Sequence, residues 1–169
     1  MTEQLGRGYE GTSDRFQSMM RAANWDPRAS APILALLRAD NRVTGALERA
    51  VGQAELTLPK FNVLIELAQT PGGRLPLHEI RRRLVKSAPN ITSLVDRLET
   101  EGLLQRTRDT ADRRVVIAQI TELAWKRLAV ATPSLLETER RLLRDLSKAD
   151  WAALWNLLRR VAPPSQQEG

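Results

Sequence analysis

The chain has no cysteine and only one histidine, His78, among its 169 residues. The absence of thiols excludes disulfides, cysteine-based zinc sites and thiol redox switches within the chain. A single imidazole is too few for a multi-histidine metal site. The apolar runs are only a few residues long, whereas a bilayer span needs about 20, and no basic-then-apolar signal segment opens the chain. We therefore expect no metal site, no membrane contact and a cytoplasmic location.

Catalytic motifs are missing as well. Neither a pair of carboxylates at a catalytic spacing nor a glycine-rich phosphate loop accompanies the lone histidine. Enzymes assemble their sites from such groups. We therefore predict that the chain is not an enzyme and holds no cofactor.

Positive charge is present and unevenly distributed. The chain has 26 basic and 20 acidic residues, a net charge of +6. Ten basic and six acidic residues lie between Arg74 and Arg114, so about a quarter of the chain holds +4 of that charge. A local basic excess favours a polyanion such as nucleic acid. A solvated, salt-bridged surface is the alternative.

The spacing of apolar residues predicts a mostly helical chain. A tail of about twelve residues precedes a short amphipathic helix capped by Ser13, and Asp26-Pro27 ends that helix. Further helices are expected from Ala31 to Ala54, over residues 58–69 with Thr57 as the cap, from Pro76, and over residues 87–101 with Ser87 as the cap. A long helix is expected from Thr121 to about Thr132, with a kink or restart at Pro133 and a continuation to Leu146, and a last helix from Ser147. Asp150, three residues after Ser147, completes a capping box.

One hairpin interrupts the helices. The arm LLQRTR, the four-residue loop DTAD and the arm RRVVIAQI run from residue 103 to 120, and the second arm is the only convincing strand in the sequence. Arg106, Arg108, Arg113 and Arg114 stand around the loop. An arginine-bearing tip can enter the narrow, electronegative minor groove of DNA. A solvated turn is the alternative, but the helices directly upstream favour DNA contact.

The expected elements follow the order of a winged helix-turn-helix: a short helix, a turn, a capped helix that ends at Gly102, and a hairpin. The stripe Ile91, Leu94, Val95 and Leu98 would hold the 87–101 helix from behind, so that short polar groups face outward toward base edges in the major groove. The residues expected to bind DNA from this helix are Lys86, Ser87, Pro89, Asn90, Thr92, Ser93 and Arg97. Those expected to form the wing and phosphate contacts are Arg82, Arg83, Arg108, Asp112, Arg113 and Arg114. The alternatives are a neutral exposed helix face and solvated charges.

The segment NITSLVDRLETEGLLQRTRDTADRRVVIAQIT closely resembles the MarR-type transcriptional regulators. Their pattern has a helix ending in LVDRLE, then GLL and an arginine, a D-x-R wing, and a strand that runs into a threonine and the next helix. These positions are Leu94 to Leu98, Gly102-Leu103, Arg106, Asp112, Arg114 and Ile120-Thr121. The resemblance extends over roughly residues 31 to 161.

The resemblance implies a mainly α fold with a small β-hairpin wing, assembled as a homodimer. Residues 31–56 and 121–162 would form the helical dimerisation region and residues 57–120 the winged helix-turn-helix lobe. Residues 1–30 would be a tail with an extra short helix, and residues 163–169 a C-terminal tail. Each subunit would read half of a palindrome on double-stranded DNA, with the 87–101 helix in the major groove and the 106–114 wing in the minor groove. Arg114 would be the wing-tip arginine, and Asp112 would pair with a nearby arginine.

The resemblance also implies regulation of a nearby operon, and we predict a repressor, associated with the nucleoid when DNA is bound. Repression in such proteins is often relieved by a small aromatic or phenolic acid in a crevice beside the dimer region. Trp25, Asn62 and Trp125 are the candidate pocket residues, with plain packing as the alternative for both tryptophans. Urate is not predicted, because Asn62 and Leu94 stand where the urate-responsive branch has its acid and arginine.

Other interpretations remain open at this point. Trp151 and Trp155 are expected in a dimer or domain core, because an aromatic pair at helical spacing usually packs. His78 is expected on the surface of a short helix. A non-specific architectural DNA-binding protein and a winged-helix protein-interaction module are the alternative functions.

Overall fold

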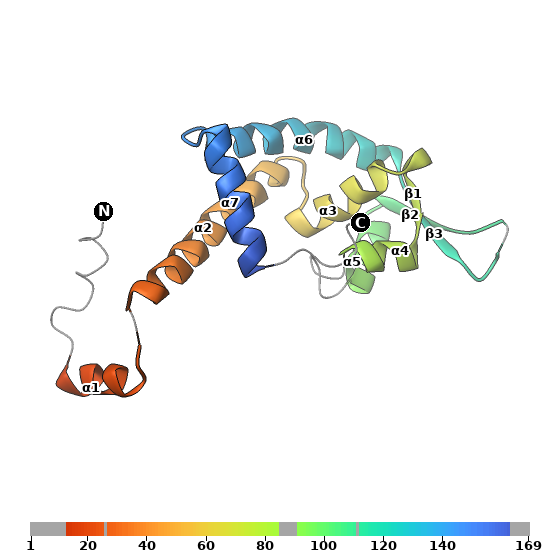
Figure 1. Cartoon of the computed structure of the whole chain (residues 1–169). Helices are drawn as coiled ribbons and strands as arrows, with labels where there is room; N and C mark the ends of the chain where they lie inside the picture. Colours follow the sequence, from red (N-terminus) through yellow and green to blue (C-terminus); the bar gives the residue numbers. More distant parts are fainter. Residues whose placement is uncertain (1–12, 26, 85–90, 111, 163–169) are drawn as a thin grey trace. The chain divides into compact units, whose positions relative to one another are not determined.

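The computed structural model describes residues 13–25, 27–84, 91–110 and 112–162 (Figure 1). The chain divides into two compact units, residues 1–45 and residues 46–169. None of the described helices is both long enough and apolar enough to cross a membrane.

The first unit contains α1 (Asp14–Ala22) and most of α2 (Pro27–Gly52). The Ser13 side chain caps α1 by accepting from the Phe16 amide, as predicted. The long helix α2 begins at Pro27, four residues earlier than expected, because proline fits the first turn of a helix. The Trp25 indole donates a hydrogen bond of 2.8 Å to the Ser30 hydroxyl.

The second unit contains the remaining elements. They are α3 (Leu58–Ala68), the 3₁₀ turn η3 (Pro71–Gly73), β1 (Arg74–Pro76), α4 (Leu77–Leu84), α5 (Ile91–Thr100), β2 (Leu104–Arg108), β3 (Val116–Ile120), α6 (Glu122–Leu143) and α7 (Lys148–Val161). The end of α2 and helices α3 to α6 enclose one core with the sheet, in which Val51, Leu64, Ile80, Leu98 and Leu103 are fully buried. This mainly helical architecture with a small wing confirms the predicted fold class.

The sheet has three antiparallel strands in the order β1-β3-β2. The predicted hairpin is therefore joined by a strand that the sequence analysis missed. β1 has three residues and ends in a proline, which suits an edge strand but gives no alternating pattern. The hairpin loop is also longer than the predicted DTAD, because β2 and β3 pair only from Leu104 opposite Ile120 to Arg108 opposite Val116.

Local signals determine several helix ends. The Thr121 side chain accepts from the Ala124 amide at 3.2 Å, and α6 then continues through Pro133 as one helix. Ser147 and Asp150 form the predicted capping box of α7. Thr57, in contrast, makes no capping bond with its side chain, and the Leu58 amide donates instead to Glu48 Oε2 at 3.0 Å.

The two tryptophans of α7 do not belong to a core of the single chain. Trp151 is 45% exposed and Trp155 is 59% exposed. Of the two expected places for this pair, the domain core is therefore wrong, and burial in a dimer remains a prediction.

Candidate nucleic-acid interface

Helix α5 presents a polar face to solvent. Ile91, Val95 and Leu98 are buried beneath it, whereas Thr92 and Arg97 are exposed and Ser93 is partly buried. Three of the four residues of the predicted inner stripe are thus buried, whereas Leu94 of that stripe and Ser93 of the expected outer face are both partly buried. Four further predicted contacts, at positions 86, 87, 89 and 90, lie outside the described residues.

The arginines of α4 are exposed, but two of them already have acidic partners. Arg82 Nη2 lies 2.6 Å from Glu79 Oε2, one turn away on the same helix. Arg83 Nη1 lies 2.7 Å from Glu66 Oε1 on α3. Arg81 is exposed and forms no ion pair within the described part of the chain. Arg82 and Arg83 were predicted as phosphate contacts, but both have acidic partners, so Arg81 is a further candidate for such a contact.

Arg106 does not belong to the exposed arginines of the hairpin loop. Its guanidinium forms an ion pair with Asp96 of α5, and its Nε lies 3.2 Å from Glu99 Oε2 on the same helix. The Arg106 side chain is 28% exposed. This arginine therefore joins the base of the wing to the helix that carries the polar face.

The wing loop is held by hydrogen bonds between side chains and backbone. Asp112 Oδ1 accepts from the Arg114 amide at 2.9 Å, and the Asp112 amide donates to Asp109 Oδ1 at 3.2 Å. Arg108 Nη1 donates to the Arg113 carbonyl at 3.0 Å. The Asp109 amide closes the loop by donating to the Val115 carbonyl at 2.9 Å.

Asp112 therefore acts differently from the expectation. The resemblance implied an ion pair with a nearby arginine, but no ion pair of Asp112 is present among the described residues. Instead its carboxylate bonds the backbone two residues further on, as short acidic side chains do in turns. Asp112 still fixes the shape of the loop, but it does so without neutralising an arginine.

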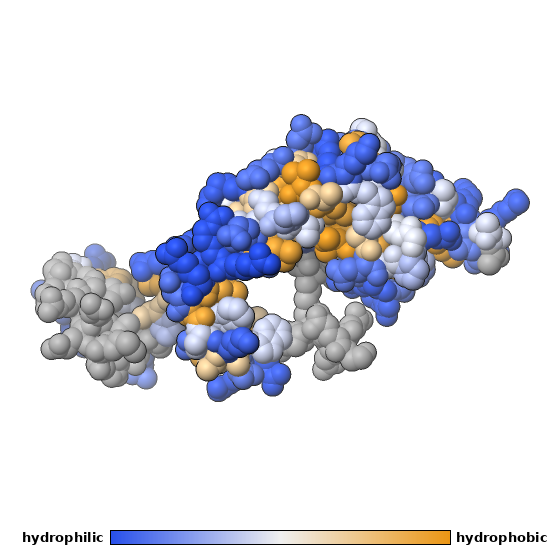
Figure 2. Space-filling view, turned by 90° about the horizontal axis from the view of Figure 1, so that it is seen from above, coloured by the Kyte–Doolittle hydropathy of each residue, from blue (hydrophilic) through white to orange (hydrophobic). Residues whose placement is uncertain are grey.

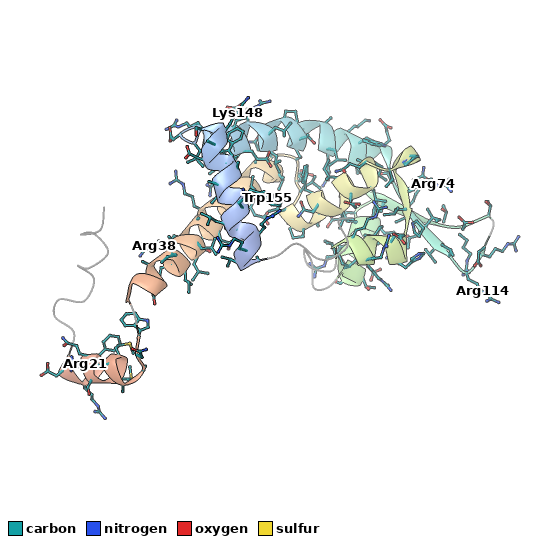
Figure 3. The ribbon with its side chains drawn as sticks, in the orientation of Figure 1. Arg21, Arg38, Arg74, Arg114, Lys148 and Trp155 are labelled. Atoms are coloured by element: carbon teal, nitrogen blue, oxygen red, sulfur yellow. The ribbon has the colours of Figure 1, made fainter. Side chains whose placement is uncertain are left out.

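Arg113 and Arg114 are the exposed cations of the loop between β2 and β3, and Arg108 at the end of β2 is exposed as well. Neither Arg113 nor Arg114 forms an ion pair within the described part of the chain. Arg114 lies at the far end of the wing, away from the body of this unit (Figure 3), and that end of the surface is hydrophilic (Figure 2).

Ion pairing separates the basic residues of this region into two groups. The acids Glu79, Asp96 and Glu99 are taken up by arginines that hold the fold together, and Glu101 accepts from Lys60 at 2.6 Å. The positive excess is therefore left on the remaining arginines. Of these, Arg81, Arg97, Arg113 and Arg114 lie on α4, α5 and the wing. This division of the charge leaves these four arginines available for contacts with phosphates.

The three candidate pocket residues lie in different parts of the chain. Trp25 belongs to the first unit, whereas Asn62 on α3 and Trp125 on α6 belong to the second. Asn62 is partly buried and Trp125 is 42% exposed. A Cβ placed on Gly73 would lie 3.3 Å from Trp125 Cζ2, so the indole packs over the turn before β1. The pocket remains a prediction.

His78 is exposed on α4, as expected, with Nε2 3.6 Å from Glu79 Oε1. Among the described residues there is no group of three side chains suited to hold a metal ion.

A polar-faced helix held by an apolar stripe, next to a hairpin with three exposed arginines, defines a winged helix-turn-helix protein. Residues 56–116 match the MarR family. The HTH-type transcriptional regulator MhqR of Bacillus subtilis is 29% identical over 134 residues, which are 79% of this chain and 91% of MhqR. The HTH-type transcriptional regulator YfiV of the same organism is 36% identical over 72 residues, 43% of this chain and 44% of YfiV.

The fold agrees with these similarities. The MarR family transcriptional regulator Sco3205 of Streptomyces coelicolor, solved in complex with DNA, superposes with a TM-score of 0.70 at 22% identity, covering 83% of this chain and 92% of Sco3205. The family match, the curated relatives and the fold together support a MarR-family helix-turn-helix regulator.

Proposed function

We propose that this protein is a homodimeric, sequence-specific DNA-binding repressor of a nearby operon, acting in the cytoplasm on the nucleoid. One observation carries the proposal. Two exposed arginines stand on a loop that Asp112 fixes, and Arg106 joins the base of that loop to the polar-faced helix α5. Helix and wing are thus held as one unit, which suits simultaneous contact with a major groove and the minor groove beside it.

The exposed apolar side chains support a dimer. In the first unit Ile33 is 61% exposed and Leu37 is 54% exposed, and in the second unit α7 exposes Trp155 and Leu157 to 59% and 57%. Monomeric proteins rarely leave large contiguous apolar patches in water. A two-fold dimer presents two identical recognition surfaces, so the matching site is a palindrome whose half-sites lie about one helical turn, 34–36 Å, or a multiple of it apart.

Relief of repression would follow from differential binding. A small aromatic acid that prefers a dimer shape with the wrong distance between recognition helices lowers the affinity for the operator without any catalysis. Trp25, Asn62 and Trp125 are the proposed contacts for such a ligand. Their aromatic and amide groups offer the mixture of apolar wall and few polar groups found in small-molecule sites.

The test is the binding of the full chain to DNA from upstream of its own gene, followed by fluorescence anisotropy over a salt series, with a scrambled duplex as the control. The proposal predicts a preference of 1,000-fold or more for the operator, roughly the lower end for specific regulators, and a dimer by sedimentation. Equal binding to operator and scrambled duplex would show an architectural protein. A complete lack of binding to DNA from the whole upstream region would favour a protein-interaction module.

A further inference from the structure

Three helices of this chain end in the same way. A backbone amide three or four residues beyond the helix end donates to the carbonyl five residues earlier: Trp25 to Met20 after α1, Leu56 to Val51 after α2, and Leu103 to Leu98 after α5. This ending places one residue in the left-handed region of the backbone.

The three left-handed positions are filled differently. Gly102 has φ +70° after α5, and Asn24 has φ +49° after α1. Both residue types tolerate this conformation. After α2 the position is Glu55, with φ +55°, although a residue of that size is disfavoured there by roughly 1 kcal/mol or more. The choice of glutamate therefore needs a reason other than ending the helix.

Arg127 of α6 supplies the reason. Its Nη2 donates to Glu55 Oε2 at 2.8 Å, and its Nη1 donates to the Glu55 carbonyl at 3.1 Å. One guanidinium thus holds both the side chain and the strained backbone. The Glu55 side chain is 80% exposed, so the carboxylate contributes little by burial.

The position of this pair in the chain is equally informative. Glu55 lies where the chain passes from α2 into α3 and the DNA-binding lobe, between the buried residues Ala54 and Leu56. Arg127 lies in the second turn of α6, the helix that directly follows β3, the last strand of the lobe (Figure 1). The pair therefore ties together the two connections by which the lobe is attached to the helical region. The Ser134 hydroxyl adds a second tie by donating to Gln53 Oε1 at 3.3 Å.

We propose that Glu55 and Arg127 are positioning residues, a clamp that sets the angle of the DNA-binding lobe on α6. Strained residues that are held by their surroundings concentrate at switch regions. In a dimer this angle determines the distance between the two recognition helices and therefore the half-site spacing that the protein accepts. This consequence for DNA rests on the proposed function.

The first experiment separates the clamp from the helix end. Glu55→Gly keeps the left-handed ending in its preferred residue but removes the carboxylate, so the urea midpoint should be equal to or higher than that of the wild type. Operator affinity should nevertheless fall about fivefold or more, and operators with altered half-site spacing should lose less than the optimal one. Arg127→Met should do the same, and the double variant should add nothing further.

Arg140→Met is the matched control. Arg140 lies on the same helix, and its ion pair is with Glu137 of that helix at 3.6 Å. Its removal should leave affinity and spacing preference unchanged. If Glu55→Gly and Arg127→Met bind every spacer length as the wild type does, Glu55 ends a helix and nothing more, and the clamp is refuted.

A second experiment does not depend on DNA. The chain has no cysteine, so spin labels can be placed on cysteines introduced at the exposed positions Thr107 of β2 and Glu139 of α6. With labelled protein diluted in unlabelled protein, the intrachain distance should be narrowly distributed and should broaden or shift in Glu55→Gly. An unchanged distribution would overturn the clamp. If the wild type does not bind the operator but the label distance still changes in Glu55→Gly, only the proposed function is overturned and the clamp stands.

Discussion

The ion pairs of Arg106 predict a variant that loses DNA affinity beyond its loss of stability. Arg106→Met keeps the apolar stem of the side chain but removes the contacts with Asp96 and Glu99. Partly exposed pairs contribute roughly 0.2–1 kcal/mol each, and the two carboxylates are 54% and 41% exposed. We therefore expect a loss of about 1 kcal/mol. With a urea m-value of about 2 kcal/mol per molar, the midpoint falls by roughly 0.5 M.

The effect on DNA binding should be larger, because the wing is no longer joined to α5. A wing that must be ordered during binding costs conformational entropy, and we expect roughly tenfold weaker operator binding, about 1.4 kcal/mol. Lys60→Met is the control, since it breaks the 2.6 Å pair with Glu101 at the end of α5 without touching the wing. If both variants lose stability and affinity in the same proportion, the argument that Arg106 orders the wing is wrong.

Three further predictions concern turns and caps. Gly102→Ala should lower the free energy of unfolding by about 1–2 kcal/mol, because only the left-handed φ opposes a side chain there. Gly73→Ala should lower it by roughly 1–3 kcal/mol more, since its Cβ would lie 2.7 Å from Ile120 Cγ1. Similar urea midpoints for the two variants would contradict this difference. Asp112→Asn keeps an oxygen for the loop amide and should retain operator affinity, whereas Asp112→Ala should lose several-fold; a loss of the same size in both would restore a charge-based role. Hydrogen bonds from Ser147 hold the pKa of Asp150 below its ordinary 3.8, so the stabilisation is complete above that pH and is lost as the pH falls through the lowered pKa. Asp150→Asn should abolish this part of the acid dependence in thermal unfolding, and an unchanged acid profile would show that the cap carboxylate does not titrate in this way.

The sequence predicted features whose causes are local. The Thr121 and Ser147 caps and the Gly102 stop each depend on residues within about one turn of the position they affect, so a short pattern contains the whole cause. The apolar stripe of α5 could be recognised for the same reason, because helical periodicity is visible in ten residues.

The features that were missed depend on partners distant in the sequence. β1 exists because residues Arg74 to Pro76 pair with β3. A segment of three residues that ends in proline does not by itself predict a strand. The Thr57 side chain makes no capping bond, and the amide of Leu58 donates to Glu48, ten residues before Leu58 in the sequence.

The arginines show the same limit at the site. All four near the hairpin look alike in the sequence, and only the fold places Arg106 against α5 while leaving Arg114 exposed. Glu66 lies 17 residues from Arg83, so no helical spacing indicates their ion pair.

The proposed function depends on contact between the exposed wing arginine Arg114 and DNA, and this contact can be tested by its removal. Operator affinity should be compared over a salt series for wild type, Arg114→Ala and Arg74→Ala. Arg74 is also exposed and lies opposite Gln119 on β3, away from the wing loop that precedes Val116. Because both residues are arginines, the two substitutions change the net charge equally. We expect Arg114→Ala to lose roughly tenfold in operator affinity and to lower the salt slope by about one, with Arg74→Ala close to wild type. Equal effects of the two substitutions, or none from Arg114→Ala, would contradict this expectation.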